Sequence, residues 1–302
     1  MTAAKASGVE KYIASAVWCL GWAYAELGDH HSSYAHLQEA YRLFNTLPPG
    51  EDELQRLGGQ CGINLVDTAR LVLWPDINKA VSLARDVDRE CAALSDNIIR
   101  GRSLVLLGAV LQDAGQPQEA LHYLDQTRTM LKAAGNTYNL ADAYLSISRV
   151  HYSQGRLPEA LGAIEEAWKH AQLTENVSIQ AVIVLDFSMI LFTTNRDTEA
   201  WEYLKLSLMK ASYLGNRVVV ARALEYMGYG YLRRGDYQNA YGAYEAALEK
   251  YLGTIDESHA TERCEENMAR IKEKEENTDT VIGFYRPGMD IDKTLFYPGV
   301  CE

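Results

Sequence analysis

The chain has 302 residues, of which 47% are hydrophobic and 23% charged, and its formal net charge is −12. This composition is typical of a globular protein rather than of a disordered or fibrous one. The excess of negative charge disfavours nonspecific binding to nucleic acid. No apolar run reaches the ~18 residues that a membrane-spanning helix needs. We therefore expect no nucleic-acid and no membrane partner.

The cysteines favour a reducing compartment. They are odd in number and lack the spacing of a metal site or of a disulfide framework: Cys19, Cys61, Cys91, Cys264 and Cys301. The N-terminus also lacks the apolar stretch of a secretory signal. We expect a protein of the cytoplasm or the nucleus.

The apolar spacing predicts a first helix pair at residues 9–45, with helices at 9–27 and 31–45. The next pair, residues 52–94, is the least regular. Its first helix contains three glycines, each of which costs about 1 kcal/mol relative to alanine inside a helix, and it places Asp67 in a column that is apolar in the other pairs. We expect this helix to bend or to start late.

Four regular pairs follow at 96–134, 136–173, 176–213 and 216–253. Residues 256–277 then carry one narrow apolar stripe surrounded by charge, which is what the terminal helix of a stacked array needs. Residues 278–302 are rich in aromatic and aliphatic side chains, and two prolines exclude a continuous helix there. We predict that this C-terminal tail folds back against the helices as an intramolecular ligand.

The pairs repeat at an interval of 40 residues. One alanine column runs through Ala80, Ala120, Ala160, Ala200 and Ala240, and a second column of small residues through Gly108, Ser148, Ser188 and Gly228. Residues that tolerate left-handed backbone recur at Gly115, Gly155, Asn195 and Gly235. Good N-cap residues recur at Asp96, Asn136, Asn176, Asn216 and Asp256. Four columns in one register indicate a true repeat.

Residues 223–251 show what kind of repeat this is. They resemble the tetratricopeptide repeat, whose first helix reads W-x2-L-G-x2-Y and whose second helix reads A-x3-F-x2-A. The matching residues are Leu224, Met227, Gly228, Tyr231, Ala240, Tyr244 and Ala247. The resemblance implies an all-α fold: a right-handed α-solenoid of about six helix pairs over residues 1–277, closed by a capping helix.

In this family the first helix of each pair lines a concave groove that binds peptides. Carried over by position, the candidate groove residues are Trp18, Trp22, Arg102, Arg149, Tyr152, Val182, Leu185, Met189, Phe192, Arg222, Glu225 and Tyr229. For the apolar ones, packing between neighbouring helices is an equal alternative. An apolar floor flanked by arginines suits a peptide with apolar anchors and some acidic residues.

No catalytic or phosphate-binding motif is present, and Asp67 and His151 are better interpreted as structural residues. We therefore predict a non-enzymatic protein without cofactor or metal that binds another protein or a peptide. The 40-residue unit resembles the arms of fungal NLR-like signalling NTPases and spindle-orientation adaptors, which implies a scaffold or ligand-sensing arm. The alternative is a peptide-sensing regulator similar to bacterial quorum-sensing receptors of this fold.

Overall fold

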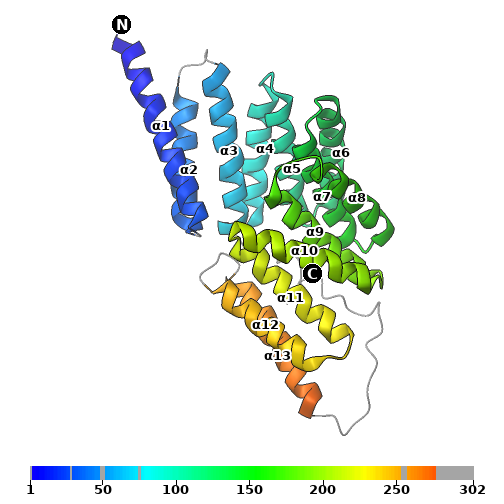
Figure 1. Cartoon of the computed structure of the whole chain (residues 1–302). Coiled ribbons are helices and arrows are strands. Elements are labelled where there is room, and N and C mark those ends of the chain that lie inside the picture. Colours follow the sequence, from blue (N-terminus) through cyan, green and yellow to red (C-terminus); the bar gives the residue numbers. More distant parts are fainter. Residues whose placement is uncertain (1, 28, 48–51, 74–75, 253–256, 277–302) are drawn as a thin grey trace. The chain divides into compact units, whose positions relative to one another are not determined.

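The computed structural model describes residues 2–27, 29–47, 52–73, 76–252 and 257–276, which form thirteen helices and, within these ranges, no strand (Figure 1). The first seven are α1 (Thr2–Glu26), α2 (His30–Thr46), α3 (Asp52–Val72), α4 (Ile77–Ala92), α5 (Asn97–Asp113), α6 (Pro117–Ala133) and α7 (Thr137–Ser153). The others are α8 (Leu157–Ala171), α9 (Val177–Thr193), α10 (Asp197–Leu214), α11 (Arg217–Arg233), α12 (Tyr237–Tyr251) and α13 (Glu257–Glu276).

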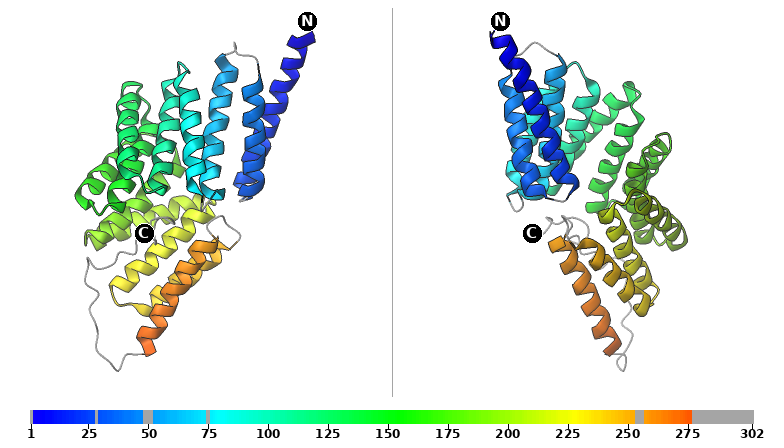
Figure 2. Two further views of the ribbon diagram at one scale, coloured as in Figure 1. Left: turned by 180° about the vertical axis from the view of Figure 1, so that it is seen from behind. Right: turned by 60° about the vertical axis from the view of Figure 1, so that its left-hand side comes forward.

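The predicted all-α class is confirmed, and α1–α12 form six antiparallel pairs. The helices divide into two compact units, Met1–Ser146 and Ile147–Glu302, and the boundary falls inside α7. Within each unit, successive helices lie side by side, as α1 and α2 or α12 and α13 do in both views of Figure 2. One continuous domain over residues 1–277 stays a prediction.

The predicted helix ends are confirmed by their hydrogen bonds. The side chain of Asp96 accepts from two backbone amides, and those of Asn136, Asn176 and Asn216 each accept from the amide three residues on. The breaks within the pairs have left-handed backbone, with φ of 59° at Asn195 and 70–73° at the three glycines of that column. Only Asp256 of these columns lies outside the described residues.

The small-residue columns are confirmed as helix crossings. All five alanines of the alanine column are fully buried. A Cβ added to Gly108 would lie 2.7 Å from Leu124 Cγ, and one added to Gly228 would lie 2.8 Å from the Tyr244 ring. Side chains are absent at these points because the facing helix occupies the space.

The expectation for the second pair is wrong in two respects. α3 starts directly at Asp52 and not late, and it is unbroken through its glycines. A Cβ on Gly59 or Gly62 would crowd side chains of the neighbouring helices, which explains the glycines, while a bend in this helix stays a prediction. Close packing outweighs the low helix propensity of glycine. Asp67 is exposed rather than a core residue.

The stripe of α13 packs on α12 as predicted. Ala260, Cys264 and Ile271 are buried in one cluster with Tyr244 and Tyr251, and Met268 packs against it. No helix in the described part of the chain has the length and apolar character required to span a bilayer. The predicted fold-back of residues 278–302 concerns a segment outside the described residues.

Candidate functional site

A pocket in the second unit lies where the first helices of three successive pairs, α7, α9 and α11, meet. Its lining residues are Ser148, Arg149, Tyr152, Asp186, Met189, Ile190, Arg222 and Tyr226. Arginine, aspartate and tyrosine side chains thus share a small depression with two aliphatic ones. This mixture is typical of a binding site in which a few polar groups orient a ligand on an apolar floor.

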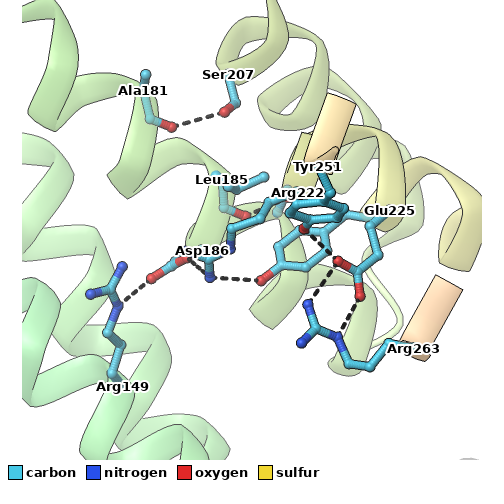
Figure 3. Close-up of polar contacts among 11 residues, drawn as sticks. Arg149, Ala181, Leu185, Asp186, Ser207, Arg222, Glu225, Tyr251 and Arg263 are labelled. Carbon is cyan, nitrogen blue, oxygen red and sulfur yellow. Dashed lines mark hydrogen bonds and ion pairs between the residues drawn. The ribbon is translucent and has the colours of Figure 1, made fainter. Parts of the chain in front are cut away.

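Asp186 is the centre of this pocket (Figure 3). Arg149 Nε donates to Asp186 Oδ2 at 2.6 Å, and Arg222 Nη2 lies 3.8 Å from Asp186 Oδ1. The aspartate side chain is 11% exposed, whereas the two arginines are 25% and 26% exposed. Two cations therefore share one carboxylate, and both remain accessible to solvent.

The repeat explains why these residues meet. First helices of successive pairs run in the same direction, so residues at equal height are about one repeat apart in sequence. Arg149 and Asp186 are 37 residues apart, and Tyr152 meets Thr193, 41 residues away, at 2.9 Å between the two hydroxyl oxygens. Arg222 lies 222 − 186 = 36 residues after Asp186.

The two tyrosines of the pocket stay protonated at neutral pH. Burial raises the pKa of Tyr152 and of Tyr226, and the nearby Asp186 carboxylate acts in the same direction on both. Arg222 Nη2 is 3.4 Å from the Tyr226 hydroxyl oxygen. The hydroxyls therefore act as neutral hydrogen-bonding groups.

The pocket is small as it stands. Its free volume is about 20 Å³, which is enough for about one water molecule. A ligand side chain larger than a carboxylate would lie across the mouth, or would displace Met189 or a tyrosine.

Four of the predicted groove residues line this pocket, namely Arg149, Tyr152, Met189 and Arg222. On α9, Val182 is half-buried, whereas Leu185 and Phe192 are fully buried. Both are core residues in this structure because α9 has packed neighbours on several sides. They offer no surface to a ligand.

Glu225 and Tyr229 belong to other clusters. Glu225 is buried, and it accepts from Tyr251 Oη at 2.7 Å and from Arg263 Nε and Nη2 at 3.0 and 3.1 Å (Figure 3). Its carboxylate joins α11 to α12 and α13, so it serves the fold. Tyr229 packs edge-on against Phe192, with the Arg233 guanidinium 5.9 Å from its ring centre.

The remaining three predicted residues lie in the first unit. Trp18 packs edge-on against Phe44, Trp22 is exposed on α1, and the Arg102 guanidinium is hydrogen bonded to the Gln60 side chain. None of the three lines either of the two pockets described here for the two units. Their role in binding stays a prediction.

Asp186 and Tyr226 were missed by the sequence analysis. The signal for Asp186 is present, because it is the one charged residue in the apolar helix VSIQAVIVLDFSMILFT. A lone charge in such a helix requires a partner, since an unpaired buried carboxylate is costly. Tyr226 carries no comparable signal.

A second depression, in the first unit, is lined by Arg128, Thr129, Lys132, Ala133 and Tyr144. It is wider, at about 540 Å³, but it is an open surface, and Arg128 is already paired with Asp125 at 3.0 Å. Within the described residues, no three His, Cys, Asp or Glu side chains are grouped to hold a metal ion.

Residues 100–172 match the family model of the tetratricopeptide repeat. No curated protein sequence matches the chain significantly. Several solved structures share the fold at low sequence identity. One is the Rap conjugation gene regulator of plasmid pLS20 in complex with the Phr* peptide, with 15% identity and a TM-score of 0.61, over 88% of this chain and 75% of that one.

Two further structures are similar. A Rap protein complexed with Competence and Sporulation Factor has 13% identity and a TM-score of 0.63, over 89% of this chain and 76% of that one. A signal transduction ATPase with numerous domains and a tetratricopeptide repeat sensor, from Pyrococcus horikoshii, has 14% identity and a TM-score of 0.59, over 82% of this chain and 37% of that one. The family match identifies residues 100–172 as tetratricopeptide repeats, and the repeat columns and helix pairs show that the other described helices have the same fold.

Proposed function

We propose that this protein is a non-enzymatic binding module that captures an acidic peptide segment at the Asp186 pocket. The observation that carries the proposal is the arrangement of the arginines at the pocket. Two arginines converge on a single carboxylate, and each keeps about a quarter of its side chain exposed. A ligand carboxylate can therefore approach both guanidinium groups from the solvent side.

The net charge of the whole chain favours binding of an acidic ligand at the exposed arginines rather than elsewhere. The formal net charge is −12, so an acidic ligand is repelled over most of the surface and is attracted where the arginines are exposed. Arginine forms paired hydrogen bonds with carboxylates and suits this kind of recognition. Met189 and Ile190 beside them favour an aliphatic or aromatic residue next to the ligand carboxylate.

The chemistry of the pocket supports binding rather than catalysis. Its aspartate is held by two arginines, and the raised pKa of its tyrosines keeps their hydroxyls protonated. Ser148 Oγ donates to the Ala160 backbone oxygen at 2.8 Å. These groups orient and neutralise charge, and they are poorly suited to removing a proton at neutral pH.

The proposal is tested with random short peptides displayed with free C-termini. Wild-type protein should enrich sequences that combine a carboxylate with an apolar neighbour. A synthetic peptide with the enriched sequence should then bind at least tenfold more weakly to Arg222→Met or Arg149→Met. Either variant leaves Asp186 with one arginine, so the aspartate is not left without compensation.

Arg85→Met is the matched control, because Arg85 also pairs with a carboxylate, Glu119, at 2.8 Å, but belongs to α4 of the first unit and does not line the pocket. Its affinity for the same peptide should be unchanged. Enrichment of basic peptides, or equal loss of affinity in all three variants, would overturn the proposal. Higher salt should weaken binding in the wild type and less so in the arginine variants.

A peptide-sensing regulator is the second candidate function. The two Rap structures named above are complexes with the Phr* peptide and with Competence and Sporulation Factor, and they have the same fold over most of this chain. Binding of the selected peptide should then change hydrogen exchange in α9 and α11 beyond the contact residues, whereas a passive scaffold would show protection at the contacts alone. A cytoplasmic location fits both candidates, since the described cysteines are free thiols.

A further inference from the structure

The first helix presents an apolar face that no described residue of its unit covers. The other side of α1, with Ala14, Val17 and Trp18, packs against α2 and α3. The outer side exposes large hydrophobic residues: Val9, Tyr12, Ile13, Leu20 and Leu27. Between Val9 and Ala25, Glu10 is the one exposed charged residue. Figure 1 shows α1 at the edge of the first unit.

The solvent-exposed side of the last described helix, α13, has a different composition. The outer side of α13 carries exposed charged residues, among them Glu262, Glu265 and Arg270. A terminal helix of a repeat array needs a polar outer face of this kind. α1 has the opposite composition, and the largest apolar patch of a protein surface is often an interaction site.

One line of apolar residues along this face follows a heptad spacing. The intervals are four, three, four, three and four residues in the series Val9, Ile13, Ala16, Leu20, Ala23 and Leu27, in which Ala23 is half-buried and the others are exposed. This is the spacing of a coiled-coil seam. The Leu27 amide donates to the Ala23 carbonyl oxygen at 3.1 Å, so the helical turn continues to the end of the series.

The seam is self-complementary when reversed. In an antiparallel copy, Val9 faces Leu27, Ile13 faces Ala23, and Ala16 faces Leu20. Two of these three layers therefore place a large side chain against a small one, which fills space evenly. A parallel copy would instead pair each alanine with itself and leave gaps at two layers. The sequence thus favours a second copy of α1, packed antiparallel to the first, as the partner of this face.

We propose that two copies of this protein form a two-fold symmetric dimer through antiparallel packing of their α1 helices. Complete burial of a Val, Leu or Ile side chain removes about 60–120 Å² of apolar surface from water, as its free energy of burial divided by the usual energy per unit area gives. Complete burial of a tyrosine removes about 150–250 Å². The partly exposed residues of this face therefore supply on the order of 500 Å² per copy. Two copies would therefore bury roughly 1,000 Å² in total, which is at the lower bound for a specific interface.

Cys19 reports this arrangement directly. The symmetry axis passes midway between Ala16 and Leu20, and Cys19 lies one residue from that midpoint on the edge of the seam. At 1.5 Å rise per residue, the two Cys19 residues differ by only about 3 Å along the helix axis. Cys19 is exposed, whereas Cys61, Cys91 and Cys264 are buried, and burial raises the pKa of those three thiols to about 12, about 11 and about 12.

The experiment uses the full chain in a Cys301→Ser background, with mass measured by light scattering across protein concentrations under reducing conditions. The wild-type seam should give the mass of two chains. A short thiol-to-thiol cross-linker should join the copies through Cys19, and Cys19→Ser should abolish the product. Leu20→Glu should weaken the dimer at least 100-fold, because symmetry places the charge in the seam twice.

Leu27→Glu is the second variant, since Leu27 is 78% exposed and the change leaves the fold intact. It should also give a monomer. Leu173→Glu is the matched control, because Leu173 is 69% exposed but lies outside the first unit, and it should remain dimeric. A monomeric wild type, or a dimer that survives both seam variants, overturns the proposal. So does Cys19 cross-linking that is equally fast in wild type and Leu20→Glu.

Discussion

Asp186 and Glu225 are acidic residues on neighbouring helices of the second unit, and arginines hold both, yet their surroundings differ. Glu225 accepts from Tyr251 and twice from Arg263, and its side chain is 6% exposed. Asp186 has one short contact, to Arg149, and a long one, to Arg222, and these arginines remain open to solvent. Both are ion pairs, so the difference is the exposure of the arginines. The Glu225–Arg263 pair fixes α13 on α11, whereas a ligand can reach the arginines of Asp186.

The largest expected effect on stability comes from breaking the buried Glu225–Arg263 ion pair. Glu225→Gln removes the charge that compensates Arg263, whose side chain is only 17% exposed. Loss of one partner of a buried pair is strongly destabilising, so the free energy of unfolding should fall by about 3 kcal/mol in denaturant titration. α13 should also become sensitive to protease. Glu262→Gln, an exposed change on the same helix, should alter it by less than about 0.5 kcal/mol.

A smaller effect is expected from separating the helices that bring Tyr251 to Glu225. Gly228→Ala places a Cβ 2.8 Å from the buried Tyr244 ring between α11 and α12, and such overpacking costs about 1–3 kcal/mol. Gly162→Ala is the matched control, because a Cβ there meets nothing within 4 Å. It should stabilise by about 0.5–1 kcal/mol through helix propensity. Equal melting of both variants would contradict the assigned crossing.

Much of the fold is predictable because the helices of each repeat begin and end through contacts between residues that are close in sequence. Asn176 and Asn216 cap helices through their own neighbours, and Gly155 ends one through its own backbone. Such local chemistry appears in the sequence as columns. α3 shows the limit, since the packing that makes its glycines favourable is contributed by α2 and α4.

The candidate site was only partly predictable because its contacts do not follow the columns. Asp186 meets Arg149 at a separation of 37 residues and Arg222 at 36, not 40. The offset depends on how far neighbouring helices slide past one another, which no single repeat encodes. The same packing buries Leu185 and Phe192, which position alone assigned to the groove.

Removing the charge of Asp186 should have a different effect from removing that of Glu225: it should raise peptide affinity and change stability little. Asp186→Asn leaves both arginines partly exposed to water, so it should change stability by no more than about 1 kcal/mol. It removes a negative charge near an incoming carboxylate, which at intermediate effective dielectric amounts to about 1 kcal/mol. The selected acidic peptide should therefore bind the variant roughly fivefold more tightly in calorimetry. Asp113→Asn, which affects the Arg70–Asp113 pair of the first unit, should leave peptide affinity unchanged.

The smallest effect on stability is expected from truncation after Asn277, which removes residues 278–302. That segment contains Phe284, Tyr285 and Phe296 together with acidic residues, the combination proposed for a ligand of the Asp186 pocket. If it acts as an intramolecular ligand, the truncated protein should melt slightly lower, and its affinity for the selected peptide should rise several-fold, because a tethered competitor has a high effective concentration. A synthetic peptide of residues 278–302 should then compete with the selected peptide for the truncated protein and compete far less for its Arg222→Met variant. Unchanged melting and affinity without competition would show that the tail is no ligand of the pocket, and would leave the pocket itself to be judged by the arginine variants.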